Sequence, residues 1–239
     1  MSATFESTLS PEATRSSPYG FKASPYSSHA RLMQAFDEPG RGRRVVDVGG
    51  GEGYLSRALV DRGYAVTCVA QPGTASPALP ASVEVVEADL NREPLELGGR
   101  FSRALCGDVL EHLVDPLDVL ERLAASLEED GCLVASLPNG AHWFVRLNVL
   151  FGRFPEDDKG LFDRTHLHFY AWKNWARLLN KAGLEVVSLE PTVVPFDLAL
   201  PRIGQGPIGR ALEAANYWAA KLWKELWAYQ FVIVARKRA

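Results

Sequence analysis

A glycine-rich turn directly after a short apolar run constrains the fold of this chain more than any other feature. Residues 44–48 (Arg-Val-Val-Asp-Val) have the composition of a buried strand, and residues 49–53 (Gly-Gly-Gly-Glu-Gly) follow at once. Glycine at such a turn lets the backbone approach a ligand, because no side chain stands between them. The dinucleotide fingerprint G-x-G-x-x-G would require glycine at Tyr54 or Ser56. The turn therefore predicts a ligand site at the end of a strand and disfavours a nicotinamide-dependent oxidoreductase.

Apolar runs that indicate strands alternate with amphipathic stretches that indicate helices. Strands are expected at residues 44–48, 64–70, 83–87, 103–106, 132–137, 184–189 and 231–235. Helices are expected at residues 53–62, 116–127, 171–182 and 208–226, with a weaker helical pattern at 23–36. This alternation predicts an α/β fold, in which a doubly wound, mostly parallel sheet is covered by helices on both faces.

The composition excludes several classes of protein. Apolar residues make up 47% of the 239 residues and charged residues 23%, as in folded domains, and a net charge of −3 gives no attraction to nucleic acid. The three cysteines (Cys68, Cys106 and Cys132) are too few and too scattered for a disulfide framework. There is no apolar run of about 18 residues and no secretory signal pattern, so we expect a cytoplasmic protein without a transmembrane segment.

The chain is expected to fold as one domain with a tail. Residues 1–22 are rich in Ser, Thr and Pro, which predicts a disordered tail. Residues 23–239 would form the domain, with an insert at about 138–170 and an amphipathic helix at about 208–226.

The glycine turn carries a resemblance to a known family. Asp47, Gly49, Gly51 and Gly53 form a D-x-G-x-G-x-G pattern that resembles motif I of the class I S-adenosylmethionine (SAM) methyltransferases. The resemblance covers residues 40–190 approximately, plus the final strand. It implies a Rossmann-like methyltransferase fold of seven strands in the order 3-2-1-4-5-7-6, with the last strand antiparallel. It also implies that the glycines pass under the methionine part of SAM and that Asp47 holds its amino group.

Four further positions are assigned to the cofactor by the same resemblance. Asp89, with Leu90 beside it, matches the acid that bonds the adenine, and Asp108 follows the fourth strand. An aspartate after a strand is also a common turn or cap residue. The family's ribose-binding acid is replaced by Ala70, and Gln71, the next residue, would substitute for it with weaker hydrogen bonds. A methyltransferase-fold binding or accessory protein that has lost SAM therefore stays an alternative.

A second match follows the fourth strand. Residues 101–116 (FSRALCGDVLEHLVDP) resemble the branch that includes ubiquinone-biosynthesis O-methyltransferases, and lack the N-P-P-Y-like tetrapeptide of DNA methyltransferases. His112, His166 and His168 are the candidate general bases, because imidazole titrates near neutral pH. A less favoured alternative is a divalent metal held by Asp108, Glu111, His112 and His166. The simpler interpretation is that Glu111 and His112 shape the turn and line the pocket, and we expect no metal.

The insert and the C-terminal helix indicate which molecules this chain could contact. Aromatic residues and arginines in the insert suit a small-molecule acceptor that is partly apolar or anionic, or else form a small satellite core. The apolar seam of residues 208–226 is expected to pack on the sheet, whereas its tryptophans and lysines would also suit peripheral membrane contact or a homodimer. His29 and His142 are expected to be partly exposed. The resulting prediction is SAM-dependent methylation of a small molecule, at oxygen rather than nitrogen, by a monomer or homodimer.

Overall fold

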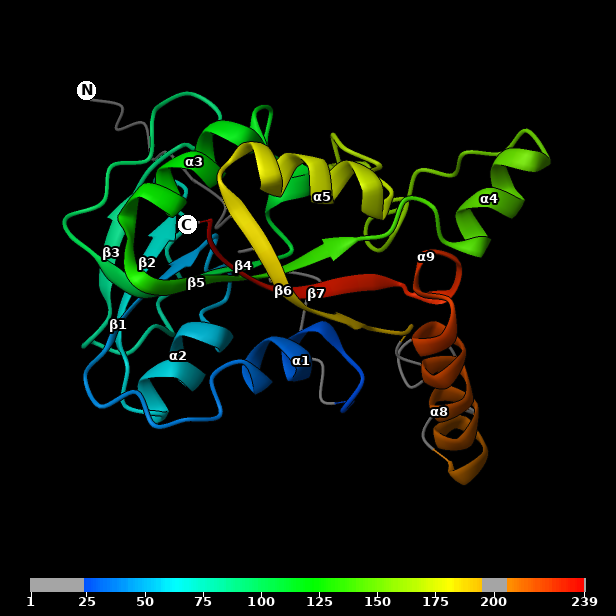
Figure 1. Cartoon of the computed structure of the whole chain (residues 1–239), viewed down its shortest axis with the longest axis horizontal. Coiled ribbons are helices and arrows are strands. Elements are labelled where there is room, and N and C mark those ends of the chain that lie inside the picture. Colours follow the sequence, from blue (N-terminus) through cyan, green and yellow to red (C-terminus); the bar gives the residue numbers. More distant parts are fainter. Residues whose placement is uncertain (1–23, 195–205, 239) are drawn as a thin grey trace, which may run out of the picture.

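Seven strands form one sheet in the computed structural model, which describes residues 24–194 and 206–238 (Figure 1). The strand order is β3-β2-β1-β4-β5-β7-β6. The strands are β1 (Arg44–Val48), β2 (Ala65–Ala70), β3 (Glu84–Glu87), β4 (Phe101–Gly107), β5 (Leu127–Pro138), β6 (Leu184–Pro191) and β7 (Gln230–Lys237). Neighbours from β3 to β5 are parallel, and β7 runs antiparallel to both β5 and β6. The predicted fold class and strand order are confirmed, whereas the predicted tail at residues 1–22 lies outside the described residues.

Helices cover both faces of the sheet, as the alternation predicted. The helices are α1 (Ser28–Gln34), α2 (Tyr54–Asp61), α3 (Pro116–Ser126), α4 (Trp143–Leu150), α5 (Trp172–Lys181), α8 (Pro207–Leu222) and α9 (Lys224–Trp227), with a 3₁₀ turn η1 (Leu110–His112). Figure 1 shows α1 and α2 on one face of the sheet and α3 and α5 on the other. Successive strand residues belong to different faces: Val46 and Val48 pack in one core cluster, and Val45 packs in the second.

The cysteines lie in strands β2, β4 and β5, where each is buried and unpaired. Cys106 is fully buried in the same core cluster as Val46 and Val48, and burial raises its pKa well above the usual range of a thiol. The expected absence of a disulfide framework agrees with these three placements. Among the described residues, no helix has both the length and the hydropathy needed to cross a membrane.

The C-terminal helix corrects one prediction. The expected helix at 208–226 is divided into α8 and α9, and its apolar seam does not face the sheet. Ile208 is 69% exposed and Leu222 is 89% exposed, whereas Gly209, Glu213 and Tyr217 are buried. The reason is that polar groups fix the helix: Lys221 and Tyr217 both bond to Glu190 on β6.

The insert also differs from expectation in two respects. It contains helix α4, which the sequence did not indicate because apolar residues occupy nearly all of its faces. His142, expected to be partly exposed, is only 2% exposed because it caps α4: its Nδ1 accepts a hydrogen bond from the backbone N–H of Phe144 at 3.3 Å.

Candidate functional site

The glycine turn connects β1 to α2 through three residues with left-handed backbone. Gly49, Gly51 and Gly53 have φ angles of 72°, 47° and 77°. A side chain at Gly49 would lie 2.5 Å from Val109, and one at Gly53 would lie 2.8 Å from Leu79. A Cβ at Gly51 would meet only the carbonyl oxygen of Gly49, at 3.7 Å. Gly51 is therefore the position at which the turn faces open space, as required for a ligand that lies against the backbone.

Asp47 lies beneath this turn rather than on its open side. Its side chain is 1% exposed, and Ser56 on α2 donates a hydrogen bond to its Oδ2 at 2.6 Å. Burial raises the pKa of Asp47 to about 6, although the bond from Ser56 opposes the shift. The carboxyl thus ties the end of β1 to the first turn of α2. Its predicted contact with the SAM amino group stays a prediction.

The ends of β2 and β3 hold the other expected cofactor residues. Gln71 is exposed, and Ala70 is paired with Glu87 across the ladder. The carboxylate of Asp89 accepts a hydrogen bond from the backbone N–H of Asn91 and pairs with Arg92 at 3.3 Å. Asp89 therefore acts as a turn residue here, and Leu90 packs against the core. Their roles toward the adenine stay predictions.

Asp108 is held in place by two strands that the sequence did not connect with it. It has φ of 57°, a left-handed conformation that is uncommon for a residue with a side chain. Its backbone N–H donates to Ser136 Oγ on β5 at 2.8 Å, and the Ser136 hydroxyl donates to Asp108 Oδ1 at 2.5 Å. Gln230, the first residue of β7, donates to the same oxygen at 2.9 Å. The carboxylate is therefore fixed where β4, β5 and β7 meet.

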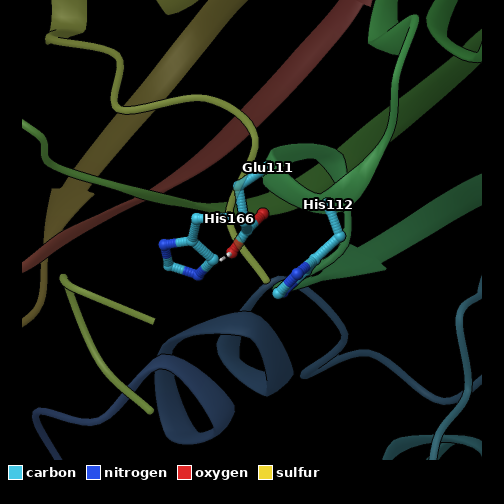
Figure 2. A group of neighbouring side chains, drawn as sticks. All are labelled: Glu111, His112 and His166. Atoms are coloured by element: carbon cyan, nitrogen blue, oxygen red, sulfur yellow. Dashed lines mark ion pairs between the residues drawn. The ribbon is translucent and has the colours of Figure 1, made fainter. Parts of the chain in front are cut away.

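Glu111, His112 and His166 lie together beside this point (Figure 2). Glu111 and His112 belong to η1, and His166 belongs to the segment before α5. That segment is joined to η1 because the backbone N–H of Leu167 donates to the Glu111 carbonyl at 2.8 Å. Figure 2 shows the three side chains gathered together, and the centroids of the two imidazole rings are 4.8 Å apart.

Hydrogen bonds determine the tautomer of His112. Its Nδ1 lies 3.1 Å from the carbonyl oxygen of Thr165 and 3.0 Å from Thr165 Oγ1. The Thr165 hydroxyl donates to Asp163 at 2.6 Å, so its oxygen is an acceptor toward the imidazole. Both neighbours of Nδ1 are therefore acceptors, which assigns the ring proton to Nδ1 and leaves a lone pair on Nε2.

The other two histidines have different surroundings. The side chain of His166 is 7% exposed, and its Nε2 lies 3.9 Å from Glu111 Oε1. Burial, followed by the neighbouring His112, lowers the pKa of His166 to about 4. The Nε2 of His168 donates to the carbonyl of Leu113 at 2.9 Å, and its ring stacks on Tyr170. His168 therefore fastens the segment to the chain after η1, and the roles of the three histidines as bases stay predictions.

The same cluster can be compared with the requirements of a metal. The donor atoms of Glu111, His112 and His166 lie within 4.8 Å of one another, whereas bonds of about 2.1 Å place two donors at most about 4.2 Å apart across an ion. Two imidazoles and a carboxylate suit zinc, manganese or iron better than magnesium. The set fits such an ion only after a small closure. Asp108, the fourth residue of that alternative, is held by Ser136 and Gln230 instead.

Aromatic side chains of the insert continue from this cluster. Phe162 is buried with Val145 and Leu161 in a small separate core. The aromatic residues for which a satellite core was the alternative are exposed instead: Trp143, Phe144, Phe151 and Phe154. Phe154 and Phe169 are half exposed, with ring centroids 4.9 Å apart, and Phe169 lies 6.0 Å from His166. The insert thus has its own core and also places aromatic edges next to the histidines.

Comparisons with known proteins agree with this architecture. A family model described as a methyltransferase domain matches residues 24–189. The ubiquinone biosynthesis O-methyltransferase of Xanthomonas campestris pv. campestris (strain B100) is 29% identical in an alignment of 179 residues; the match covers 62% of this chain and 75% of that protein. Among solved structures, an S-adenosylmethionine-dependent methyltransferase from Mesorhizobium loti has a TM-score of 0.60 at 15% identity, covering 88% of this chain and 98% of that one. The 1,6-didemethyltoxoflavin-N1-methyltransferase of Burkholderia thailandensis has a TM-score of 0.53 at 20% identity, covering 91% and 80%.

Proposed function

Because the chain belongs to the class I SAM-dependent methyltransferase family, we propose that it transfers the SAM methyl group to a hydroxyl oxygen of a small molecule. The single observation that carries this proposal is the contact of His112 Nδ1 with two oxygens of Thr165, because it places the ring proton on Nδ1 and would leave the Nε2 lone pair to accept a hydroxyl proton. The name of the Xanthomonas relative supports oxygen as the acceptor atom.

Bound SAM would supply a methyl group that its sulfonium charge has already activated. The chain then has to place the acceptor oxygen in line with that methyl group and exclude water. We assign the methionine part to the open side of the turn at Gly51, beside Asp108, and the hydroxyl proton to His112 Nε2. His166 stays neutral near pH 7 because its pKa is about 4, and it would pack against the acceptor rather than take the proton.

The insert at residues 138–170 would cover the acceptor. Phe154 and Phe169 offer aromatic edges beside the histidines, and Arg146 and Arg153 in the same insert are exposed cations. This combination favours an acceptor with a ring or apolar part and an anionic group.

The test begins with the spent cofactor and continues with turnover. Titration calorimetry with S-adenosylhomocysteine should show binding to the wild-type chain, and a panel of phenols with radiolabelled SAM should show methylation. His112→Ala should lower the methylation rate about 10²–10⁴-fold and leave the affinity for S-adenosylhomocysteine unchanged. His168→Asn is the comparison variant, because His168 fastens the segment before α5 to the chain after η1. This variant should lower the temperature of thermal unfolding. Full activity of His112→Ala at all pH values would remove this histidine as the base.

One observation favours a second candidate function, that of a SAM-independent binding protein. Ala70 stands where the family has a ribose-binding acid. The next residue, Gln71, is polar but carries no charge, and Pro72 follows it. Absence of heat and of a thermal shift with millimolar S-adenosylhomocysteine would support that candidate.

The metal alternative has its own test, which is to measure methylation before and after treatment with a chelator. Unchanged turnover after the treatment would show that the reaction needs no divalent cation.

A further inference from the structure

A carboxylate lies next to the position where the family's ribose-binding acid is missing. Ala70 is the last residue of β2, and Glu87, the last residue of β3, is its partner across the parallel ladder. The backbone N–H of Ala88 donates to the Ala70 carbonyl at 2.9 Å, so the pairing continues to the carboxyl ends of both strands. Neighbouring strands lie about 4.8 Å apart, a distance that a glutamate side chain can span. The carboxyl end of β2 therefore has an acid beside it, although β2 itself carries none.

The glycine turn lies on the other side of Ala70. β1, β2 and β3 are consecutive strands of the sheet (Figure 1). The backbone N–H of Gly49 donates to the carbonyl of Val69 at 2.8 Å, which joins the start of the turn to the end of β2. A ligand that lies on the turn at Gly51 can therefore reach Glu87 by crossing the end of one strand.

The side chain of Glu87 points to the same face of the sheet as the position of the missing acid. Val69 belongs to one core cluster and Val86 packs against that cluster, so these two side chains share a face. Because successive strand residues alternate between faces, Ala70 and Glu87 both point to the opposite face. Asp47 points to that face as well, where it bonds to α2. The acids of the turn motif and of β3 thus lie on one side of the sheet.

The Glu87 carboxylate has acceptor capacity that the fold does not use. The residue is exposed, and its Oε1 accepts one hydrogen bond from the backbone N–H of Gly73 at 3.1 Å. That bond holds the carboxylate beside the loop that follows β2. Among the described residues no cation pairs with Glu87, whereas Asp89 is paired with Arg92 at 3.3 Å. A carboxylate can accept about four hydrogen bonds, so Gly73 uses only part of this capacity.

We propose that Glu87 binds the two ribose hydroxyls of SAM in place of the acid that β2 lacks. A vicinal diol offers two O–H donors, and a carboxylate accepts both with its two oxygens through charge-assisted bonds. The side chain of Gln71, the substitute that the sequence indicated, has a single carbonyl oxygen as its acceptor and no charge. This assignment rests on the proposed use of SAM, but it does not depend on the methyl acceptor or on His112 as the base.

Titration calorimetry with two ligands tests the assignment. The ligands are S-adenosylhomocysteine and its 2′,3′-dideoxy analogue, which lacks both ribose hydroxyls. The wild-type chain should bind S-adenosylhomocysteine about tenfold or more tightly than the analogue. Glu87→Gln should lower the affinity for S-adenosylhomocysteine about tenfold and leave the affinity for the analogue unchanged. The reason is that the amide can still accept the bond from Gly73, whereas it offers the diol no charge and no second acceptor oxygen.

Glu84→Gln is the matched control. Glu84 is an exposed acid at the first position of the same strand, so its replacement removes the same charge far from the carboxyl end of β2. This variant should keep the wild-type affinity for both ligands. Circular dichroism of Glu87→Gln should match that of the wild type, because the replaced side chain is exposed.

The outcomes that would overturn the assignment can be told apart. If Glu87→Gln prefers S-adenosylhomocysteine over the analogue as strongly as the wild type does, the assignment is wrong while the proposed function stands. An equal loss of affinity for both ligands would show that Glu87 only holds the loop after β2. Loss of the preference in Gln71→Ala alone would assign the diol to Gln71. A wild-type chain that binds neither ligand would remove the proposed function together with the assignment.

Discussion

The Asp47 carboxyl holds the glycine turn in place, but its burial lowers the stability of the folded chain when the group is ionised. The group is buried, its pKa is raised to about 6, and Ser56 is its hydrogen-bond donor. Ionisation above that pH puts a charge in a desolvated position. A chain selected for stability alone would have no reason to keep an acid here, so its presence agrees with the ligand role that the motif implies.

Asp47→Asn should therefore stabilise the chain, but only above a certain pH. The pKa of Asp47 is higher in the folded chain than the usual value of 3.8, so the folded state loses stability relative to the variant as pH rises from about 4 to about 6. We expect the two chains to be equally stable near pH 4 and the variant to gain about 1–3 kcal/mol at pH 7–8. Urea unfolding at several pH values measures this. A stability difference that does not change with pH would contradict the raised pKa.

The residues of the site were predictable to different degrees. The glycines, Asp47 and His112 stand in local patterns, so their positions follow from a strand, a turn and the residues directly after them. Ser136 and Gln230 could not be found in this way, because they meet Asp108 from strands far along the chain; Gln230 is 122 positions away. His142 was predicted wrongly, since its burial depends on α4, whose apolar residues surround the helix and give no periodic signal.

At the scale of elements, the β1–turn–α2 unit makes a sharp prediction at Gly51. Its φ of 47° is unfavourable for a β-branched residue, and its Cβ would stand on the open side of the turn. Gly51→Val should abolish binding of S-adenosylhomocysteine while the helix content measured by circular dichroism stays nearly the same. The backbone strain should reduce stability by about 1–2 kcal/mol.

Gly63→Val is the matched control for that strain. Gly63 follows α2 with φ of 81°, and only the backbone nitrogen of Arg41 lies near its Cβ position, at 3.6 Å. Both variants should lose similar stability, but only Gly51→Val should lose the ligand. If calorimetry shows that Gly51→Val binds as well as Gly63→Val, the turn does not contact the ligand.

Most elements followed from the sequence, and the exceptions have physical reasons. The predicted strands 44–48 and 184–189 agree with β1 and most of β6, because buried runs and their turns are local signals. The prediction of which face of α8 is buried was wrong. The sequence pattern locates an apolar stripe, but it does not reveal the contacts of Lys221 and Tyr217 with Glu190 that decide which face meets the sheet. Hydrophobic periodicity assumes that every apolar face finds a core, and here one does not.

At the scale of the whole molecule, two buried histidines should make stability depend on acid. Burial lowers the pKa of His142 and of His166 to about 4, below the usual 6.5. Both are therefore neutral in the folded chain, and the stability is complete above pH 6.5 and is lost as pH falls toward 4, where the unfolded chain binds the extra protons. Each histidine can contribute a slope of about 1.4 kcal/mol per pH unit in that range.

His142→Asn isolates one of the two contributions. Asparagine can still accept the hydrogen bond from the Phe144 N–H at the start of α4, but it does not titrate. Between pH 6.5 and 4.5 the variant should lose about 1–3 kcal/mol less stability than the wild type, with a further reduction when His166→Asn is added. Thermal unfolding across this range measures the slopes. Parallel curves for variant and wild type would show that His142 is protonated without cost.

The position of β7 in the sheet also determines when the sheet can form during synthesis of the chain. β7 is made after the other six strands, yet it lies between β5 and β6 and supplies Gln230 to the Asp108 carboxylate. While a ribosome is still adding residues 230–237, β5 and β6 each have an unpaired edge, and Asp108 lacks its hydrogen bond from Gln230. Stalled translation intermediates should therefore attract chaperones that recognise open strands, and no small ligand at the site could rescue them at that stage.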